Sequence, residues 1–233
     1  MDKSAAAYSK EIASHYKAYR PELHSILLKK CLQADSFQRG LDVGSGVGHS
    51  SIALTSYCKE VIGLEPSAFM LQKAHQHPQI RYESFYTQVS KPYDLLCFFG
   101  VLFYINDKEL NQYLLGLSQT GRVIVADFKI DYSYAIDLLQ LNVQKLNYEH
   151  ISDKNRFNQE FSLLKSEVFL TPSQCTILEL LHLMITEPHI NTALIQRFNT
   201  TEFSQLRAEL SKIMADELIE LKAELNYLYF ERH

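Results

Sequence analysis

A stretch of alternating glycines carries the residues best suited to ligand chemistry. In residues 41–49, Asp42 stands just before Gly44, Gly46 and Gly48. Glycine tolerates positive φ and lets the backbone approach a ligand closely, where a Cβ would push the ligand away. Amides opening the helix expected after this turn would face the same ligand. The stretch therefore predicts a strand, a tight turn and a helix that bind a nucleotide-like cofactor; the alternative is a tight turn without a ligand.

A second acidic residue follows the glycines at a meaningful distance. Residues 59–65 form an apolar segment, predicted to be a strand, that ends in Glu65. An acid about 20 positions past a glycine turn hydrogen-bonds ribose hydroxyls in this kind of architecture, because one carboxylate accepts from both. Ser67 is a suitable N-cap for the helix that follows. Glu65 is therefore expected to bind a ribose; the alternative is a solvated acid at a strand end.

These motifs resemble those of a known family. Asp42 with the G-x-G-x-G spacing resembles motif I of the class I S-adenosylmethionine (SAM)-dependent methyltransferases, and the spacing differs from the dinucleotide pattern G-x-G-x-x-G. Glu65-Pro66-Ser67 followed by Met70 resembles that family's D-x-S-x-x-M-L-x-x-A. Residues 16–21, Y-K-A-Y-R-P, resemble the Y-x-x-Y-R-P that precedes the core in UbiE-like and trans-aconitate-methyltransferase-like enzymes.

The resemblance implies a cofactor, S-adenosyl-L-methionine, with S-adenosyl-L-homocysteine (SAH) as product. It implies that Arg20, in a segment folded over the cofactor, helps hold the methionine carboxylate, and a guanidinium suits a carboxylate by bidentate hydrogen bonding. The alternative is a surface arginine before a helix. The residues expected at the cofactor are Tyr16, Arg20, Asp42, Gly44, Ser45, Gly46, Gly48, Glu65, Pro66, Met70, Ser84, Phe85, Phe99, Gly100 and Tyr104. Those expected near the acceptor are Tyr19, Phe103, Tyr104 and Tyr132, and no metal site is expected.

The sequence departs from the family pattern at two places. Ser84-Phe85 stands where the family often has Gly-Asp to meet the adenine amino group. Phe103-Tyr104 stands where related enzymes often carry His-Trp. Aromatic rings there could close over a sulfonium, since a cation is attracted to a π face, or could pack in the core. The sequence thus names no catalytic residue.

The remaining pattern predicts the elements that position these residues. The first strand is expected to end at Asp42. Further strands are expected over 59–65, 80–84, 93–99, 122–128, 165–170 and 225–230. Helices are expected over 4–20, from Pro21, over 50–57, 67–75 and 107–118, from a capping pattern at 171–174 through 185, from Pro188, and over 203–222. Strands alternating with helices predict a parallel sheet with right-handed crossovers. The all-apolar 93–99 fits a central strand buried on both faces.

Together with the resemblance, this pattern predicts an α/β protein of Rossmann-like class I methyltransferase fold. We expect a mainly parallel seven-stranded sheet with an antiparallel last strand and helical cap additions. One domain is expected over 1–233, divided into an N-terminal helical lid over 1–36, a SAM-binding core over 37–130, a cap with strand six over 131–224 and a final strand over 225–233.

The composition indicates which binding partners and which cellular location are expected for the protein. The 233 residues are 46% hydrophobic, which suits a sizeable core, and the net charge of −4 without a basic run gives no footprint for nucleic acid. No apolar stretch reaches the roughly 20 residues of a membrane span, and no signal peptide is visible. The four scattered cysteines are typical of a reduced, cytoplasmic protein. The protein is expected to be a monomer or a homodimer.

The function expected is methyl transfer from SAM to a small-molecule acceptor by in-line displacement. No general base is evident after residues 93–99, which suits an acceptor that is already nucleophilic, such as a carboxylate or a thiolate. One alternative is a catalytically degenerate SAM-binding or protein-interaction scaffold. The other is a nicotinamide-dependent oxidoreductase, whose fingerprint spacing is absent.

Overall fold

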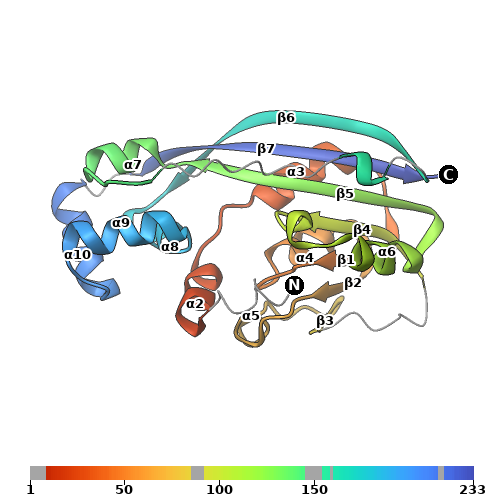
Figure 1. Ribbon diagram of the computed structural model, residues 1–233, viewed down its shortest axis with the longest axis horizontal. Helices are drawn as coiled ribbons and strands as arrows, with labels where there is room; N and C mark the ends of the chain where they lie inside the picture. The colour runs from red at the N-terminus through yellow and green to blue at the C-terminus, as the bar shows by residue number, and fades with distance from the viewer. Residues whose placement is uncertain (1–8, 85–91, 145–153, 158–159, 215–217) are drawn as a thin grey trace.

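The protein is a single mixed sheet flanked by helices, with a group of helices carried at one end (Figure 1). The computed structural model describes residues 9–84, 92–144, 154–157, 160–214 and 218–233. In this part of the chain seven strands form one sheet in the order β3-β2-β1-β4-β5-β7-β6. Neighbouring strands are parallel from β3 to β5, and β7 is antiparallel to both β5 and β6. The expected sheet, with its antiparallel last strand, is confirmed.

The parallel half of the sheet follows the sequence prediction closely. Its strands are β1 (Phe37–Val43), β2 (Cys58–Leu64), β3 (Ile80–Glu83) and β4 (Tyr93–Phe99). The flanking helices are α3 (Leu23–Leu32), α4 (His49–Leu54), α5 (Ala68–Lys73) and α6 (Asp107–Gly116), and a 3₁₀ turn, η1 (Leu102–Tyr104), precedes α6. Strand β4 lies between β1 and β5 and buries most of its residues, as its continuous apolar run indicated.

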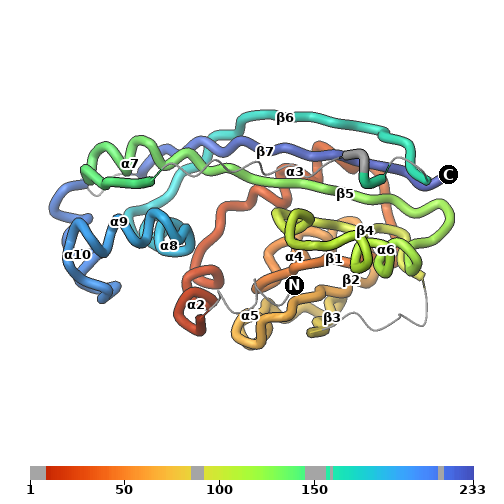
Figure 2. The backbone as a smooth tube through the Cα atoms, in the orientation of Figure 1, coloured from red at the N-terminus to blue at the C-terminus, as the bar shows by residue number. Residues whose placement is uncertain are grey.

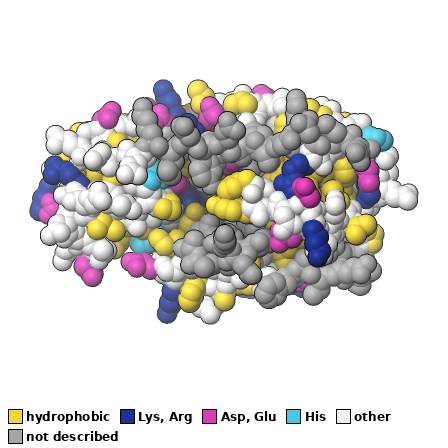
Figure 3. Space-filling view, in the orientation of Figure 1, with side chains coloured by type: hydrophobic (Ala, Val, Ile, Leu, Met, Phe, Trp, Pro, Cys, Tyr) yellow, Lys and Arg dark blue, Asp and Glu magenta, His cyan; other side chains and the backbone are white. Residues whose placement is uncertain are grey.

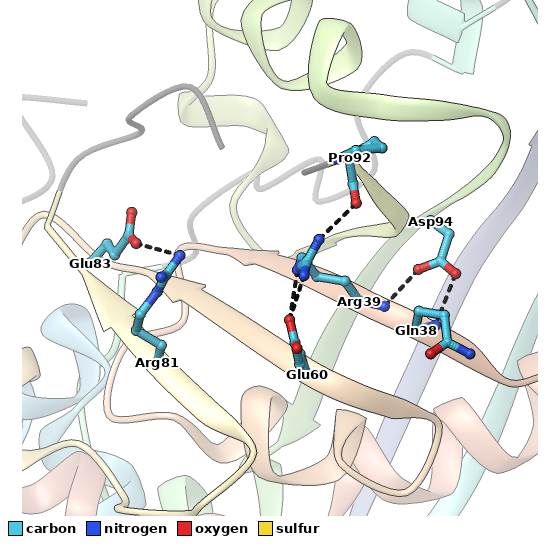
Figure 4. Close-up of polar contacts among 7 residues, drawn as sticks. All are labelled: Gln38, Arg39, Glu60, Arg81, Glu83, Pro92 and Asp94. Carbon is cyan, nitrogen blue, oxygen red and sulfur yellow. Dashed lines mark hydrogen bonds and ion pairs between the residues drawn. The ribbon is translucent and has the colours of Figure 1, made fainter. Parts of the chain in front are cut away.

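The amino ends of these strands are fixed by side chains (Figure 4). The Asp94 carboxylate accepts hydrogen bonds from the backbone amides of Arg39, at 2.8 Å, and Gln38, at 2.9 Å. It thereby extends the β1–β4 ladder past its last paired residue, Gly40. The Arg39 guanidinium ion-pairs with Glu60 on β2, so β1 is tied to both neighbours.

The antiparallel half consists of three long strands, β5 (Leu117–Asp131), β6 (Phe161–Cys175) and β7 (Ile219–Arg232). All three run beyond the core and support the helices at the left of Figure 1. The predicted strands 122–128, 165–170 and 225–230 were therefore too short. Residues 219–225 alternate buried and exposed, a strand pattern, so the predicted helix over 203–222 was wrong in its last part.

The predicted start of a helix at 171–174 was also wrong. Those residues belong to β6, the edge strand of the described sheet. An edge strand tolerates a proline such as Pro172, because it has no neighbouring strand on its outer side. The capping box lies further on, at the start of α8. There the Thr176 hydroxyl accepts from the Glu179 amide and the Glu179 carboxylate accepts from the Thr176 amide. Similarly, α6 ends at Gly116, and β5 begins where the helix was expected to continue.

In the described part of the chain, four helices that come after β5 and before β7 in the sequence pack together as a cap. They are α7 (Ser133–Leu138), α8 (Ile177–Ile185), α9 (Pro188–Phe198) and α10 (Phe203–Ile213), and a short 3₁₀ turn, η2 (Lys154–Phe157), lies outside the cap. The cap has its own apolar core, built around the fully buried Leu180, Leu181, Leu183 and Met184 of α8. Helix α2 (Lys10–Ala18) packs against α8 of the cap and α5 of the core, and the chain continues from it into α3 (Figure 2).

Helix α2 is joined to the cap by a histidine pair. Nδ1 of His15 lies 2.8 Å from Nδ1 of His182 on α8. The Phe203 ring of α10 stacks on the His182 imidazole and lies tilted against that of His15. Burial lowers the pKa of each histidine, His15 also lies beside Glu11, and His182 lies beside Glu179. One ring donates and the other accepts, so at least one imidazole is neutral in this contact.

Candidate active site

The cleft lies at the carboxyl ends of four parallel strands, β2, β1, β4 and β5. This edge of the sheet is where open α/β folds bind ligands. Segments from α2, α3 and the cap close the cleft above the sheet. Its lining residues are Tyr16, Arg20, Pro21, Leu23, His24, Gly44, Ser45, Gly46, Val47, His49, Ser50, Glu65, Pro66, Met70, Phe99, Gly100, Val101, Tyr104, Phe128, Ile130 and Glu187.

The glycine turn has the positive φ values that its sequence predicted. Gly44, Gly46 and Gly48 have φ of 73°, 57° and 89°. A Cβ on Gly44 would meet Val101, and one on Gly48 would collide with the Tyr82 side chain. At Gly46 a Cβ would have no atom within 4 Å, because this glycine faces the open cleft. Gly44 and Gly48 thus shape the turn, and Gly46 leaves room for a ligand.

Glu65 stands at the end of β2 and contacts the glycine turn directly. Its Oε2 accepts the Gly46 amide at 3.0 Å, and its Oε1 accepts the Ser67 amide at 2.7 Å. Burial raises the pKa of this carboxyl, and the two backbone hydrogen bonds oppose that shift. The Ser67 hydroxyl caps α5 by accepting from the Met70 amide, as predicted. A carboxylate accepting from two amides in a cleft is placed to accept from ligand hydroxyls as well.

Asp42 does not line the cleft, contrary to its place among the expected cofactor residues. It is fully buried behind the glycine turn, where its Oδ2 accepts from the hydroxyls of Ser50 and Ser51, each at 2.6 Å. Burial raises its pKa to about 6, against the lowering effect of both hydroxyls. Asp42 therefore anchors the start of α4 to the end of β1.

The Y-K-A-Y-R-P segment lies over the cleft, as the lid interpretation requires. The Arg20 guanidinium stacks on the Tyr16 ring at 4.1 Å and donates to the Thr186 hydroxyl at 3.0 Å. His49, at the start of α4, donates from Nε2 to the Tyr16 carbonyl at 2.9 Å. Glu187 of the cap also lines the cleft. Burial lowers the pKa of the Arg20 guanidinium, but the nearby Tyr16, Tyr132 and Glu187 together raise it above its usual value. The segment thus joins core, cleft and cap.

Several expected residues lie outside the cleft. Gly48 faces Tyr82, and Ser84 is exposed at the end of β3. Tyr19 donates to the Gln174 carbonyl at 3.3 Å, Phe103 lies against Tyr104 on the outer side, and Tyr132 is buried beneath the cap. Phe85 lies outside the described residues. Apart from Asp42, the other predicted residues, including Pro66, Met70, Phe99, Gly100 and Tyr104, are brought together in the cleft.

Sequence reasoning missed a second group of lining residues. His24 of α3 lies edge-on to Phe99 and Phe128, with ring centroids 5.2 and 4.7 Å away. Phe128 and Ile130 follow the core part of β5, so the strand-end rule that selected Phe99 would have found them. His24 carried no motif. It follows the resembling segment by only three positions, but its neighbours come from distant strands.

Comparison with known proteins identifies the family. Residues 15–163, more than half of the chain, match the methyltransferase-domain family. The chain belongs to this family. The fold and the resemblance to class I SAM-dependent methyltransferases are thereby confirmed, and the family makes S-adenosylmethionine the cofactor; the narrower UbiE-like grouping stays a prediction.

Individual proteins that resemble this methyltransferase-family chain are distant from it in sequence. A protein of Dictyostelium discoideum, named provisionally as a methyltransferase, is 33% identical over 75 residues, which span 30% of this chain and 28% of that protein's length. The structure of a provisionally assigned type II methyltransferase from Anaeromyxobacter dehalogenans superposes with a TM-score of 0.60 at 13% identity, covering 91% of this chain and 97% of the other. The YcgJ protein of Bacillus subtilis gives a TM-score of 0.51 at 16% identity, covering 90% and 98%. These structures share the fold.

Proposed function

We propose that this protein binds S-adenosylmethionine in the cleft and transfers its methyl group to a small molecule. The observation that carries this proposal is the joint position of Glu65 and Gly46. The carboxylate stands where ribose hydroxyls can donate to it, and the bare Cα beside it leaves the space that a ligand needs. Arg20, at the lid side of the same cleft, suits the methionine carboxylate.

The residues around these three groups fit the rest of the cofactor. Met70 and Pro66 offer an apolar surface beside Glu65, and Tyr104 offers a ring near the end of β4. S-adenosylmethionine supplies an activated methyl group on a sulfonium, so the protein's main task is to hold the acceptor in line and to exclude water. The lid segment and Glu187 of the cap close over the cleft and serve that task.

A small acceptor is supported by the enclosure of the cleft and by the surface charge. Side chains of both signs are scattered over the described face in Figure 3, without a broad basic patch of the kind that nucleic acid requires. In the described residues no helix is long and apolar enough to cross a membrane. A carboxylate acceptor was favoured from the sequence because no general base was evident. The structure places the His24 imidazole in the cleft, so that reason no longer applies. Carboxylic acids are therefore tested as one acceptor class among several.

The test is turnover by the purified protein. The protein is incubated with SAM and pools of small phenols, carboxylic acids, amines and thiols, and SAH and methylated products are measured by mass spectrometry. Formation of both supports the proposal. SAM binding without turnover on any pool would favour the catalytically degenerate scaffold, and absence of SAM binding by folded protein would contradict the proposal.

A further inference from the structure

The cleft is longer than the cofactor site proposed for it. Glu65 follows β2 and Phe128 lies on β5, and these strands are separated by β1 and β4. Three strand spacings correspond to about 14 Å. In the proposed cofactor site, Glu65 and Gly46 lie at the β2 and β1 end, Arg20 lies on the lid and Tyr104 lies near the end of β4. The side chains that β5 and α3 contribute to the cleft have no role in that site.

The β4 and β5 end of the cleft is lined mainly by apolar side chains and contains one imidazole, that of His24. Phe99, Phe128 and Ile130 line it, with the Phe99 and Phe128 rings stacked at 6.3 Å between centroids. His24 lies edge-on to both rings and lines the cleft. Within the described residues, no protein group hydrogen-bonds either nitrogen of this imidazole. A polar group that faces an apolar cleft without a protein partner is suited to a ligand's polar group.

His24 stays uncharged at neutral pH. Burial lowers its pKa to about 3, and the nearby His49 and Arg20 lower it further. The apolar side chains around His24 disfavour a charged ammonium group on a ligand. Arg20, whose charge would attract a carboxylate, is engaged by the methionine carboxylate in the proposed cofactor site. A neutral hydroxyl pays the smallest penalty for entering, and it can donate a hydrogen bond to an imidazole nitrogen.

We propose that His24 binds the hydroxyl group of an uncharged, ring-sized acceptor whose body lies against Phe99, Phe128 and Ile130. This inference rests on the proposed function and names the acceptor class of the same cleft. As the methyl carbon–oxygen bond forms, the carbon–sulfur bond breaks and SAH leaves. The hydroxyl proton passes to His24 and then to water.

A weak base is sufficient for this step. The oxygen becomes strongly acidic as it gains the methyl group, so the proton leaves readily to a group of low basicity. A methylated amine, in contrast, holds its proton far more tightly. The environment of His24 therefore suits a hydroxyl better than an amine, and with Arg20 engaged by the cofactor the remaining apolar walls suit a carboxylate poorly.

The experiment uses three probes that share one ring: catechol, benzoate and benzylamine. Each is titrated into the full-length protein saturated with SAH, and the His24 imidazole is followed by ¹⁵N-histidine NMR, assigned with His24→Phe. Catechol should shift the His24 resonance and bind at least 10-fold more tightly than the other two. The proposal is overturned if a charged probe binds more tightly, or if none of the three perturbs His24.

Variants separate this proposal from the cofactor proposal. His24→Phe keeps a ring against Phe99 and Phe128, and it should lower catechol methylation by about 10-fold, as expected for the loss of one hydrogen bond to the acceptor, without changing the SAH dissociation constant. His24→Gln, which retains a hydrogen-bond acceptor, should recover part of the rate. His189→Phe, the same change outside the cleft, should leave both unchanged. Failure of SAH to bind would instead contradict the proposed function, and normal catechol turnover by His24→Phe would overturn only the role of His24.

Discussion

The backbone amide of Gly46 donates a 3.0 Å hydrogen bond to Oε2 of Glu65. The two residues are 19 positions apart in the sequence, at the ends of adjacent parallel strands. The carboxylate therefore holds the glycine turn in shape and stands beside the ligand space that Gly46 leaves open. In the proposed site, the structure of the turn and the recognition of the ribose therefore depend on one side chain.

Replacing Glu65 should weaken cofactor binding. Hydrogen bonds to a charged group each contribute about 1.5–3 kcal/mol, so Glu65→Gln should raise the SAH dissociation constant by roughly 10- to 100-fold. Calorimetric titration measures this change. Glu83→Gln is the matched control, because Glu83 ends the next strand, β3, outside the cleft. Equal SAH affinity of a folded Glu65→Gln and wild type would remove the ribose assignment.

Two glycine substitutions in the same turn should separate binding from folding. Gly46→Ala places a methyl group in open space, and the left-handed backbone costs about 1–2 kcal/mol, so the protein should still fold. The methyl group occupies the space proposed for the cofactor, so SAH binding should be lost. Gly48→Ala drives a Cβ into Tyr82, so it should lower the melting temperature much further. Thermal unfolding and calorimetry of both variants check this. Full SAH affinity in Gly46→Ala would contradict the proposed cofactor position.

The amino ends of the strands should depend on Asp94. Asp94→Ala leaves two backbone amides without their acceptor, so the free energy of unfolding should fall by about 1–3 kcal/mol. Glu60→Ala, which removes only the exposed half of the Arg39 ion pair, should cost less than about 1 kcal/mol. Urea unfolding of the two variants gives the comparison. An equal loss in both would show that the ladder does not need Asp94.

The histidine pair between α2 and α8 should make stability depend on pH. Because burial lowers the pKa of His15 and His182, the unfolded chain binds their protons more readily, and stability falls as pH drops below about 6.5. The raised pKa of Asp42 acts in the opposite direction, so variants are compared with wild type at each pH.

The melting temperature of His182→Gln should therefore fall less steeply than that of wild type between pH 7 and pH 5. His233→Gln, at an exposed ring that contacts Ser162, should follow the wild-type curve. Parallel curves for wild type and His182→Gln would mean that the pair does not titrate in this range.

Local patterns predicted the parallel half of the sheet well, because each strand there carries its own signal. The buried run 93–99, the glycine turn and Glu65 were all visible in the sequence. The limits of β5, β6 and β7 depend on pairing between distant segments, such as Asp131 with Lys222, which a local pattern does not contain.

In the cleft, too, residues with a local sequence signal were predicted and residues that depend on distant packing were not. Residues at strand ends or in motifs, such as Phe99 and Arg20, were found. Asp42 was misplaced because its type fits a ligand contact equally well as a buried anchor for Ser50 and Ser51. His24 was missed because only the packing of α3 over β4 and β5 gives it neighbours that matter.

The central claim is that the cleft between Glu65, Gly46 and Arg20 is a SAM site. The most direct measurement is calorimetric titration of the wild-type protein with SAM and with SAH, alongside Gly46→Ala. The account predicts one site per chain with micromolar affinity for both ligands in the wild type, and no measurable binding by a folded Gly46→Ala. Absence of binding by folded wild-type protein, or equal binding by the variant, would contradict it.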